Sequence, residues 1–197
     1  KKMGGAAVID LQQIKSASLA RLKTNIGEID RVLGGGLVPG SLVLLSGEPG
    51  IGKSTLVAQI ASALGQGAIY VSGEESAAQV KDRLDRLTCD LNRLKFISET
   101  NVEKICTAGV SHRPAVMFID SIQTVYSALI PAEAGSISQI RAATVKFLEL
   151  AKQHDIAVIL IGHITKDGQV AGQKSLENIV DTVLYLENEA TNNYCLL

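Results

Sequence analysis

One stretch of this sequence, residues 41–56, limits the possible folds more than any other. An apolar run from Leu42 to Leu45 leads into GEPGIGKS at residues 47–54, and a helical pattern follows at once. This order fits G-x-x-x-x-G-K-[ST], the phosphate-binding loop between a strand and a helix. Glycines let consecutive backbone N–H groups turn toward an anion, and the positive end of the helix dipole points to the same place. The stretch therefore predicts a nucleotide-binding α/β domain.

The residues of this loop have separate expected roles toward ATP or ADP and its Mg²⁺. The ammonium of Lys53 reaches the β- and γ-phosphates, and the hydroxyl of Ser54 ligates Mg²⁺. A chance glycine turn is the alternative, and the strand before the loop and the helix after it argue against that reading. We expect the nucleotide to be bound by nine consecutive residues: Gly47, Glu48, Pro49, Gly50, Ile51, Gly52, Lys53, Ser54 and Thr55.

Composition indicates one folded globular domain and argues against some classes of function. The 197 residues are 46% hydrophobic and 20% charged, which suits a chain with a sizeable core and not a disordered one. Aromatic residues make up only 4%, with no Trp, which argues against a platform of stacked aromatics for single-stranded nucleic acid. The net charge of −1 implies no large basic surface, so nucleic acid would be bound by a local basic feature or through assembly.

The cysteines and the apolar runs point to a reducing compartment and to no membrane association. Cys89, Cys106 and Cys195 are isolated from one another, so neither a zinc site nor a disulfide framework is indicated. The longest apolar runs, such as residues 156–162, are far too short to span a bilayer, and the N-terminus lacks a signal-peptide core. We expect a cytoplasmic protein, with residues 1–23 as a linker segment before one domain.

Hydrophobic periodicity divides the chain into alternating strands and helices. The expected strands cover residues 41–46, 68–72, 94–97, 115–119, 156–162, 181–186 and 194–197. The expected helices cover residues 25–33, with Thr24 as the N-cap, and residues 53–64, 76–87, 101–111 and 136–153. Residues 121–135 and 165–174 read as loops. This alternation predicts a mainly parallel central sheet with helices on both faces.

Candidate chemical residues fall where the expected strands end. The phosphate-binding loop follows the first strand, and Glu74 and Glu75 follow the second. Asp120 follows the fourth strand, and His163 follows the fifth. Because ligands bind at the carboxyl edge of an open parallel sheet, we expect these side chains to surround one nucleotide.

Asp120 and one of the two glutamates are the expected acids of an ATP-hydrolysing site. Asp120 ends an apolar strand, fits the Walker B pattern and would hold Mg²⁺ directly or through water. The alternative to this metal-binding role is that Asp120 caps a helix or forms part of a turn. Because Ser121 and not an acid follows Asp120, the carboxylate that orients the attacking water must come from elsewhere. We favour Glu74, which is nearer the strand, over Glu75. Both could instead be first-turn acids that the helix dipole favours.

His163 is a candidate sensor of the γ-phosphate, and Gln123 has a similar but weaker case. The alternative for His163 is a buried histidine whose hydrogen bonds are satisfied within the fold. Lys166 and Lys174 lie in the loop that follows His163. A solvated loop face is the simple reading, whereas in a ring several copies of this loop could converge into a basic pore.

These stretches resemble the ATPase domain of the bacterial RadA (Sms) family of DNA repair proteins, which belongs to the RecA-like ATPases. The matching segments begin at Thr24, Tyr70, Phe118, Gly135 and Leu160, and they include LGGGLVPG, YVSGEES, FIDSIQTVYS, GSISQIRA and GHITKDG. The resemblance implies a RecA-like core over residues 24–197, in which another strand separates the phosphate-loop and Walker B strands. It also implies homo-hexameric rings that move on single-stranded or branched DNA, and a RecA-type recombinase as partner.

By this resemblance, Glu74 matches the catalytic glutamate and His163 the switch residue. The loops near 124–137 and 164–174 match DNA-contacting pore loops, and we include Lys166, Lys174 and Arg141 among the expected DNA contacts. The family's four-cysteine zinc finger and its C-terminal protease-like (Lon-type) domain are not matched, which suggests an isolated core. Gln173 and Asn178 stand where the family commonly has Pro and His.

Three classes of function remain open at this point. The first is a DNA-dependent ATPase motor of recombinational repair, which acts as a helicase or in ATP-driven branch migration. The second is a KaiC-like regulatory ATPase whose nucleotide state switches protein partners without DNA. The third is a small-molecule phosphotransferase, for which the sequence has no evident lid or acceptor pocket. The GSISQIRA and GHITKDG stretches favour the first.

Overall fold

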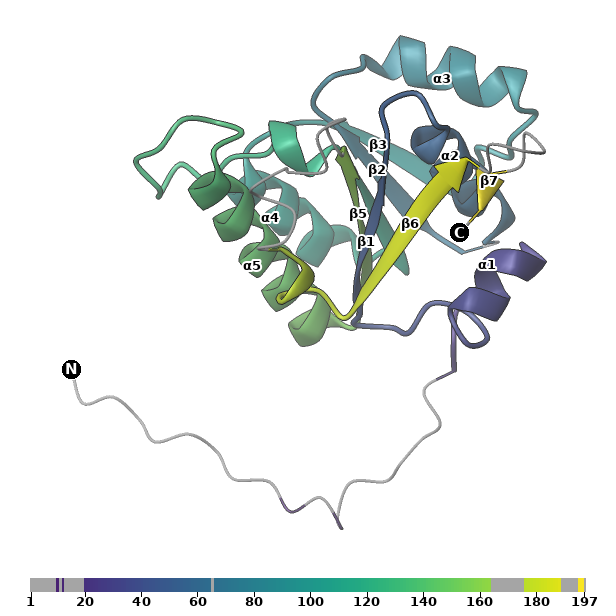
Figure 1. Cartoon of the computed structure of the whole chain (residues 1–197), viewed down its shortest axis with the longest axis horizontal. Helices are drawn as coiled ribbons and strands as arrows, with labels where there is room; N and C mark the ends of the chain where they lie inside the picture. Colours follow the sequence, from purple (N-terminus) through teal and green to yellow (C-terminus); the bar gives the residue numbers. More distant parts are fainter. Residues whose placement is uncertain are drawn as a thin grey trace.

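A computed structural model of the chain describes residues 10, 12, 20–64, 66–163, 176–188 and 195–196. Its centre is a seven-stranded sheet in the order β3-β2-β4-β5-β1-β6-β7 (Figure 1). The strands are β1 Leu42–Gly47, β2 Ala68–Ser72, β3 Leu94–Ser98, β4 Val116–Asp120, β5 Ala157–His163, β6 Thr182–Asn188 and β7 Cys195–Leu196. The helices are α1 Gly27–Val32, α2 Lys53–Ala63, α3 Ala77–Arg86, α4 Val102–His112 and α5 Ile137–His154, with a 3₁₀ turn, η2, at Ile122–Thr124.

The sheet is parallel from β3 to β6, and β7 runs antiparallel at the edge beside β6. The predicted α/β architecture is therefore confirmed. Strand β5 lies between the phosphate-loop strand β1 and the Asp120 strand β4, which is the order that the RecA-like resemblance implies. Parallel pairing brings the carboxyl ends of β1, β5, β4 and β2 to one edge of the sheet.

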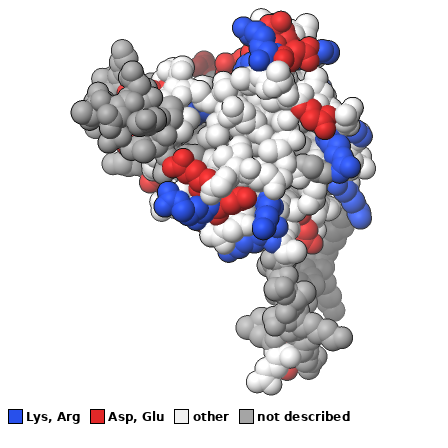
Figure 2. Space-filling view, turned by 90° about the vertical axis from the view of Figure 1, so that its right-hand side faces the viewer, with Lys and Arg blue, Asp and Glu red and all other residues white. Residues whose placement is uncertain are grey.

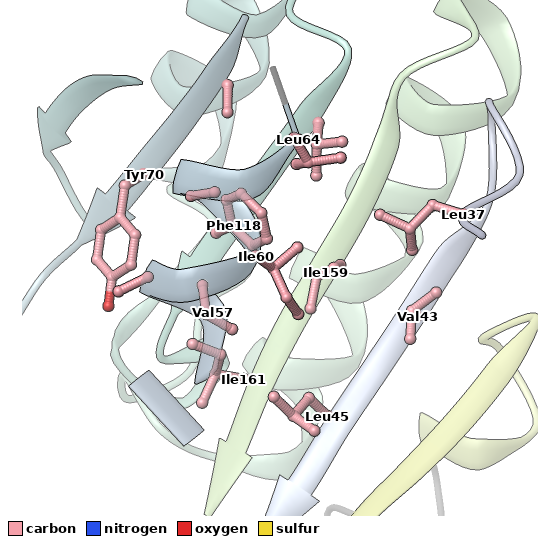
Figure 3. Close-up of a cluster of buried hydrophobic side chains, with 14 of the residues drawn as sticks. Leu37, Val43, Leu45, Val57, Ile60, Leu64, Tyr70, Phe118, Ile159 and Ile161 are labelled. Carbon is pink, nitrogen blue, oxygen red and sulfur yellow. The ribbon is translucent and has the colours of Figure 1, made fainter. Parts of the chain in front are cut away.

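Helices cover both faces of the sheet and create two buried apolar clusters. Successive residues of β1 alternate between them, with Val43 and Leu45 in one cluster and Leu42 and Leu44 in the other. The first cluster contains side chains of α1, α2 and α3 and is drawn in Figure 3. The second contains side chains of α4 and α5, including Phe147, which has no exposed surface. Burial on both faces explains why the strands read as continuous apolar runs.

Most expected elements lie where the periodicity placed them, with ends shifted by a residue or two. Strand β5 runs one residue further than expected, so His163 is its last residue and not the first residue after it. The expected loop 121–135 contains the short turn η2. Among the described residues, no helix is long and apolar enough to cross a membrane. The expected linker, residues 1–23, lies mostly outside the described part of the chain.

The prediction that Thr24 caps the first helix is wrong. Helix α1 begins at Gly27, and its N-cap position is Ile26, which makes no side-chain capping bond. Thr24 is instead buried, and it donates from its backbone N (2.9 Å) and its hydroxyl (2.8 Å) to Oδ1 of Asp30. The polar residue before the helix therefore binds a carboxylate one turn into it and does not cap its free N–H groups.

The Thr24–Asp30 contact leads to a stability prediction. Replacing Asp30 by Ala leaves two buried donors of Thr24 without their acceptor, so we expect unfolding to become easier by about 1–3 kcal/mol. Asp30→Asn keeps a carbonyl acceptor and should cost less, and Asp82→Ala on the exposed face of α3 serves as a surface control. Urea unfolding followed by circular dichroism measures all three, and equal losses for Asp30→Ala and Asp82→Ala would contradict the prediction.

Candidate active site

The phosphate-binding loop connects β1 to α2 at the carboxyl edge of the sheet. Gly52 has φ 107° and is the N-cap of α2, a conformation that residues with a side chain rarely adopt. A Cβ at Gly47 would lie 2.6 Å from the backbone oxygen of Leu186 on β6, so the loop passes too close to the sheet for any other residue. The loop backbone is therefore set by glycine where it turns and where it touches β6.

Lys53 lies inside this loop and is almost completely buried, with 3% of its surface exposed. Its Nζ donates to the backbone oxygens of Gly47 and Glu48, both at 2.8 Å. Burial lowers the pKa of Lys53, and the nearby carboxylate of Asp120 opposes that shift. The ammonium is thus held against the loop backbone by two carbonyl oxygens.

A small hollow of about 170 Å³ lies between the phosphate-binding loop and the end of β5. It is lined by Gly50, Gly52, Lys53, Ser54, Thr55 and His163. His163 is also the direct register partner of Gly47 across the β1–β5 ladder. The structure therefore brings His163 and the phosphate-binding residues together, as their positions at strand ends predicted.

His163 is half-buried, and its surroundings are mostly charged. Burial lowers its pKa most, the charge of Lys53 lowers it further, and the carboxylates of Glu74 and Asp120 oppose these effects. Its Nδ1 is buried and has no hydrogen-bond partner among the described residues. Gln123 from η2 donates to the backbone oxygen of His163 at 3.5 Å, and its own Oε1 is likewise buried without a described partner. His163 and Gln123 are therefore joined by a hydrogen bond, and each has one buried polar atom without a described partner.

Asp120 ends β4 directly beside Ser72, its register partner at the end of β2. Only 8% of its surface is exposed, and its Oδ2 accepts a short hydrogen bond from the hydroxyl of Tyr70. The next residue, Ser121, donates from its hydroxyl to Oε1 of Glu74 at 2.9 Å. The ends of β2 and β4 are thus joined by hydrogen bonds between side chains.

The two adjacent glutamates point to different partners. The hydroxyl of Ser72 accepts from the backbone N–H groups of Glu74 (3.3 Å) and Glu75 (3.1 Å), which turns the chain at the end of β2. From this turn, Glu74 reaches Ser121 at the end of β4, whereas Glu75 forms an ion pair with Arg83 of α3 at 2.8 Å. Glu74 is the acid that reaches the end of the Asp120 strand, and Glu75 is the acid that reaches α3.

A second hollow, of about 300 Å³, lies beside the phosphate-binding loop. Its walls come from α1, the start of α2 and β6, and they are mostly apolar: Ile26, Glu28, Ile29, Ile51, Gly52, Thr55, Leu56, Gln59 and Leu186. Gly52 and Thr55 line both hollows, so the two are neighbours. An apolar slot beside a phosphate site has the character expected for a flat nucleobase. The sequence patterns did not identify it because its walls come from three separate parts of the chain.

The expected DNA contacts are only partly described. Lys166 and Lys174 lie outside the described residues, and Arg141 is exposed on the second turn of α5. None of the residues that line the two hollows belongs to α5, so Arg141 is not part of the nucleotide site. The face shown in Figure 2 carries basic and acidic groups close together around a largely uncharged centre, and it has no broad basic area. On this face, the charge distribution agrees with the expectation, drawn from the net charge of −1, that the chain has no large basic surface.

The loop before α5 is held by residues that sequence patterns missed. The buried amide of Gln139 accepts from the N–H of Ser127 at 2.8 Å and donates to the backbone oxygens of Ser127, Ile130 and Ala132. Glu103 of α4 accepts from the hydroxyl of Ser127. A polar residue on the buried face of α5 was the only signal in the sequence, and it did not indicate which backbone groups it binds.

Comparisons with known proteins agree with this geometry. Residues 10–169 match a family model described as an AAA domain. The chain is 44% identical over 190 residues to "DNA repair protein RadA" of Bacillus subtilis (strain 168), covering 95% of this chain and 42% of that protein. It is 45% identical over 189 residues to the protein of that name from Streptococcus pneumoniae (strain ATCC BAA-255 / R6), covering 95% of this chain and 45% of that one. The chain thus spans less than half the length of these relatives.

A solved structure with a similar fold is the KaiC-like protein PH0186 of Pyrococcus horikoshii OT3. The TM-score is 0.71 at 22% identity, with 90% of this chain and 85% of that one covered. At this identity the similarity establishes the fold alone. Together with the family match, it confirms the RecA-like P-loop architecture and the resemblance that the sequence motifs indicated.

The lowered pKa of His163 leads to a prediction of pH dependence. In the unfolded chain His163 takes up a proton near its ordinary pKa of 6.5, whereas the folded chain resists protonation until a lower pH. Stability should therefore fall as the pH drops below the ordinary value, and His163→Asn should lose less stability over that range. Urea unfolding without nucleotide at about pH 8 and about pH 5.5 measures the difference. His112→Asn, at an exposed position of α4, should behave like the unchanged protein; equal pH dependence in both variants would contradict the prediction.

Proposed function

The chain belongs to the AAA domain family, and from this premise we propose that it is the ATP-hydrolysing core of a DNA repair motor. The observation that carries the proposal is the meeting of four strand ends around the phosphate-binding loop. Lys53, Asp120 and His163 contribute charge or a buried polar atom there, and Glu74 is bonded to the residue after Asp120. A site that only held a nucleotide would not need an acid in that place.

The donor groups present fit a nucleotide with Mg²⁺. Lys53 stands in a glycine-built cradle, and a hydroxyl and a carboxylate, from Ser54 and Asp120, are the oxygen ligands that Mg²⁺ prefers. Held by Ser54 and Asp120, Mg²⁺ would supply positive charge against the negative charge that develops during phosphoryl transfer. The backbone of residues 47–55 binds the phosphates, and the apolar slot between α1 and β6 takes the base.

Glu74 is proposed to orient and polarise the attacking water. Glu74 is exposed to solvent. The hydrogen bond from Ser121 holds Oε1 of its carboxylate, and Oε2 is left to bind the water. Glu75 is less suited because its carboxylate is already paired with Arg83. Lys53 stabilises negative charge on the transferred phosphoryl group, since its ammonium is held in place by the loop carbonyls of Gly47 and Glu48.

His163 is proposed to report the state of the γ-phosphate to the segment that follows β5. It lines the same hollow as Lys53 and Ser54, so its imidazole is placed to form a hydrogen bond with a bound phosphate. A bond that exists with ATP and not with ADP would give the two states different energies, which is what a switch requires. The residues immediately after it, 164–174, include Lys166 and Lys174, the proposed DNA contacts.

The DNA-directed part of the proposal rests on the relatives. Proteins 44–45% identical to this chain over 95% of its length carry the name DNA repair protein RadA. With the motif resemblance, we infer action on single-stranded or branched DNA as a homo-hexamer, together with a RecA-type recombinase. Lys166, Lys174 and Arg141 are the proposed DNA contacts. A KaiC-like regulatory ATPase that switches protein partners without DNA is the alternative, and only the fold similarity supports it.

The rate of ATP hydrolysis with and without single-stranded DNA tests the proposal. We expect slow turnover alone and a several-fold increase with DNA, in the full-length protein as well as in this chain if the ring forms. Turnover without any DNA effect or DNA binding would favour the regulatory alternative. Absence of ATP binding and turnover would overturn the proposal itself.

A comparison of two glutamines tests which acid acts in hydrolysis. Glu74→Gln should keep ATP binding and lower turnover by about 100-fold or more, because the water loses its base while the phosphate site is intact. Glu149→Gln, an exposed acid of α5, is the matched control and should hydrolyse ATP normally. Binding is measured with a fluorescent ATP analogue, and Lys53→Ala should abolish it. A normal rate in Glu74→Gln and a lost rate in Glu75→Gln would assign the role to Glu75.

Salt dependence of DNA binding tests the proposed DNA contacts. Replacing Lys166, Lys174 and Arg141 together by Ala should weaken binding to single-stranded DNA and reduce the slope of log affinity against log salt by about 2. Replacing Lys81 and Arg86 of α3 by Ala is the control for a loss of positive charge elsewhere, since both face solvent in pairs with Asp85 and Asp82. Fluorescence anisotropy with a labelled oligonucleotide measures both, and an unchanged slope would remove these residues from the interface.

A further inference from the structure

A chain of hydrogen bonds reaches Asp120 from outside the nucleotide site. Glu75 pairs with Arg83 at 2.8 Å, and Nη2 of Arg83 donates to the hydroxyl oxygen of Tyr70 at 3.0 Å. The same hydroxyl donates to Oδ2 of Asp120. These groups come from the turn after β2, from α3, from the middle of β2 and from the end of β4. We refer to Glu75, Arg83 and Tyr70 as the relay.

The hydroxyl of Tyr70 is not needed for packing. Figure 3 shows Tyr70 beside the apolar side chains of the first buried cluster, and it has no exposed surface. Its register partner on β4 is Phe118, and its ring stacks with that of Phe96 at a centroid distance of 6.4 Å. A phenylalanine would fill such a place, and it would avoid burying a polar group that must find partners. The hydroxyl is therefore explained by its hydrogen bond to Asp120 and not by packing.

Arg83 is also unusually buried for a charged side chain, and its partners offset the free-energy cost of that burial. Its side chain is only 18% exposed, and its Nε is buried without a described hydrogen-bond partner. Its guanidinium carbon lies 5.8 Å from the centre of the Tyr70 ring. Arg86, one turn further on α3, instead pairs with Asp82 in solvent. Among these two arginines of one helix, only Arg83 is drawn inward, toward the Tyr70 hydroxyl.

From Arg83 onward, the donors of the relay point toward Asp120, while the other side of the guanidinium pairs with Glu75. Arg83 donates to Tyr70 and Tyr70 donates to Asp120, so the cation polarises the hydroxyl and strengthens its bond to the carboxylate. One oxygen of Asp120, Oδ2, is held in this way. The carboxylate cannot rotate without losing that bond, which leaves Oδ1 as the oxygen outside the relay.

The relay starts next to the proposed catalytic acid. Glu75 follows Glu74, and the hydroxyl of Ser72 holds the N–H groups of both. A shift of this turn would move Glu74 relative to Ser121 and would also disturb Arg83 and Tyr70. The two acids of the turn thus contact the end of β4 by two routes.

We propose that Tyr70, Arg83 and Glu75 are positioning residues that orient Asp120 for Mg²⁺ and so set the metal requirement of the nucleotide site. This inference rests on the proposed function. It assigns Glu75 a place in the relay and leaves the water-orienting role to Glu74. It also predicts that loss of any relay member weakens the metal-dependent part of nucleotide binding and leaves the metal-independent part unchanged.

The binding of fluorescent ADP with Mg²⁺ and with EDTA tests the relay. In Tyr70→Phe the ring and its packing are kept and only the hydroxyl is lost. We expect the gain in affinity that Mg²⁺ provides to fall about 3- to 10-fold, with unchanged affinity in EDTA. The Mg²⁺ concentration for half-maximal ATP turnover should rise by a similar factor. Tyr185→Phe is the matched control, since that hydroxyl donates to Glu177, away from Asp120.

A double-mutant cycle separates the relay from a general loss of packing. Arg83→Gln should shift the Mg²⁺ dependence in the same direction as Tyr70→Phe, and Arg86→Gln should not. If the residues act as one chain, Tyr70→Phe combined with Arg83→Gln has no larger effect on Mg²⁺ dependence than Tyr70→Phe alone. Independent, multiplying effects would overturn the relay, as would an unchanged Mg²⁺ dependence in Tyr70→Phe.

Two further comparisons keep the outcome unambiguous. If Tyr70→Phe or Arg83→Gln fails to fold by circular dichroism, Glu75→Gln carries the test, because its carboxylate is partly exposed at the surface. A Glu75→Gln protein with the unchanged Mg²⁺ requirement then overturns the proposal. If the unsubstituted protein binds no nucleotide, the proposed function fails; if it binds and hydrolyses ATP but relay variants keep its Mg²⁺ dependence, only the relay fails.

Discussion

The parallel register of β1, β5, β4 and β2 is the constraint on which the rest of this structure depends. Register places His163 beside Gly47 and Asp120 beside Ser72, so residues far apart in the chain meet at one edge of the sheet. The ladder is held by backbone hydrogen bonds and by apolar side chains packed on both faces. The chemistry at the edge therefore depends on a core that contains none of the reacting groups.

Positive and negative groups lie close together at this edge, and they alter the pKa values of Lys53 and His163. Lys53 is buried among carbonyl oxygens, and the nearby carboxylate of Asp120 partly compensates for its burial. His163 lies near the same cation and has a lowered pKa, so it stays neutral and can accept or donate one hydrogen bond. A site with fixed positive charge, a neutral imidazole and acids on two neighbouring strands is prepared for a highly charged substrate.

The sequence predicted the parts of this structure that depend on local pattern. Apolar runs bounded by Gly and polar residues located the strands, and the strand-end rule brought Glu74, Asp120 and His163 to one edge. Prediction from the sequence failed where a polar side chain has two possible partners. Thr24 was expected to cap a helix, yet it binds Asp30. Tyr70 read as one more apolar strand residue, because periodicity reports which face a residue occupies and not which distant group its hydroxyl meets.

The pair Glu74–Glu75 shows how one turn can serve two purposes. From sequence the two acids are nearly equivalent, and only their distance from the strand separates them. In the structure a single hydroxyl, that of Ser72, turns the backbone so that Glu74 reaches Ser121 and Glu75 reaches Arg83. Because adjacent side chains leave the backbone in different directions, the proposed catalytic acid and an anchoring acid lie next to each other. Glu75 is linked through Arg83 and Tyr70 to the carboxylate of Asp120, so the same turn contacts both the proposed water-orienting group and the proposed metal ligand.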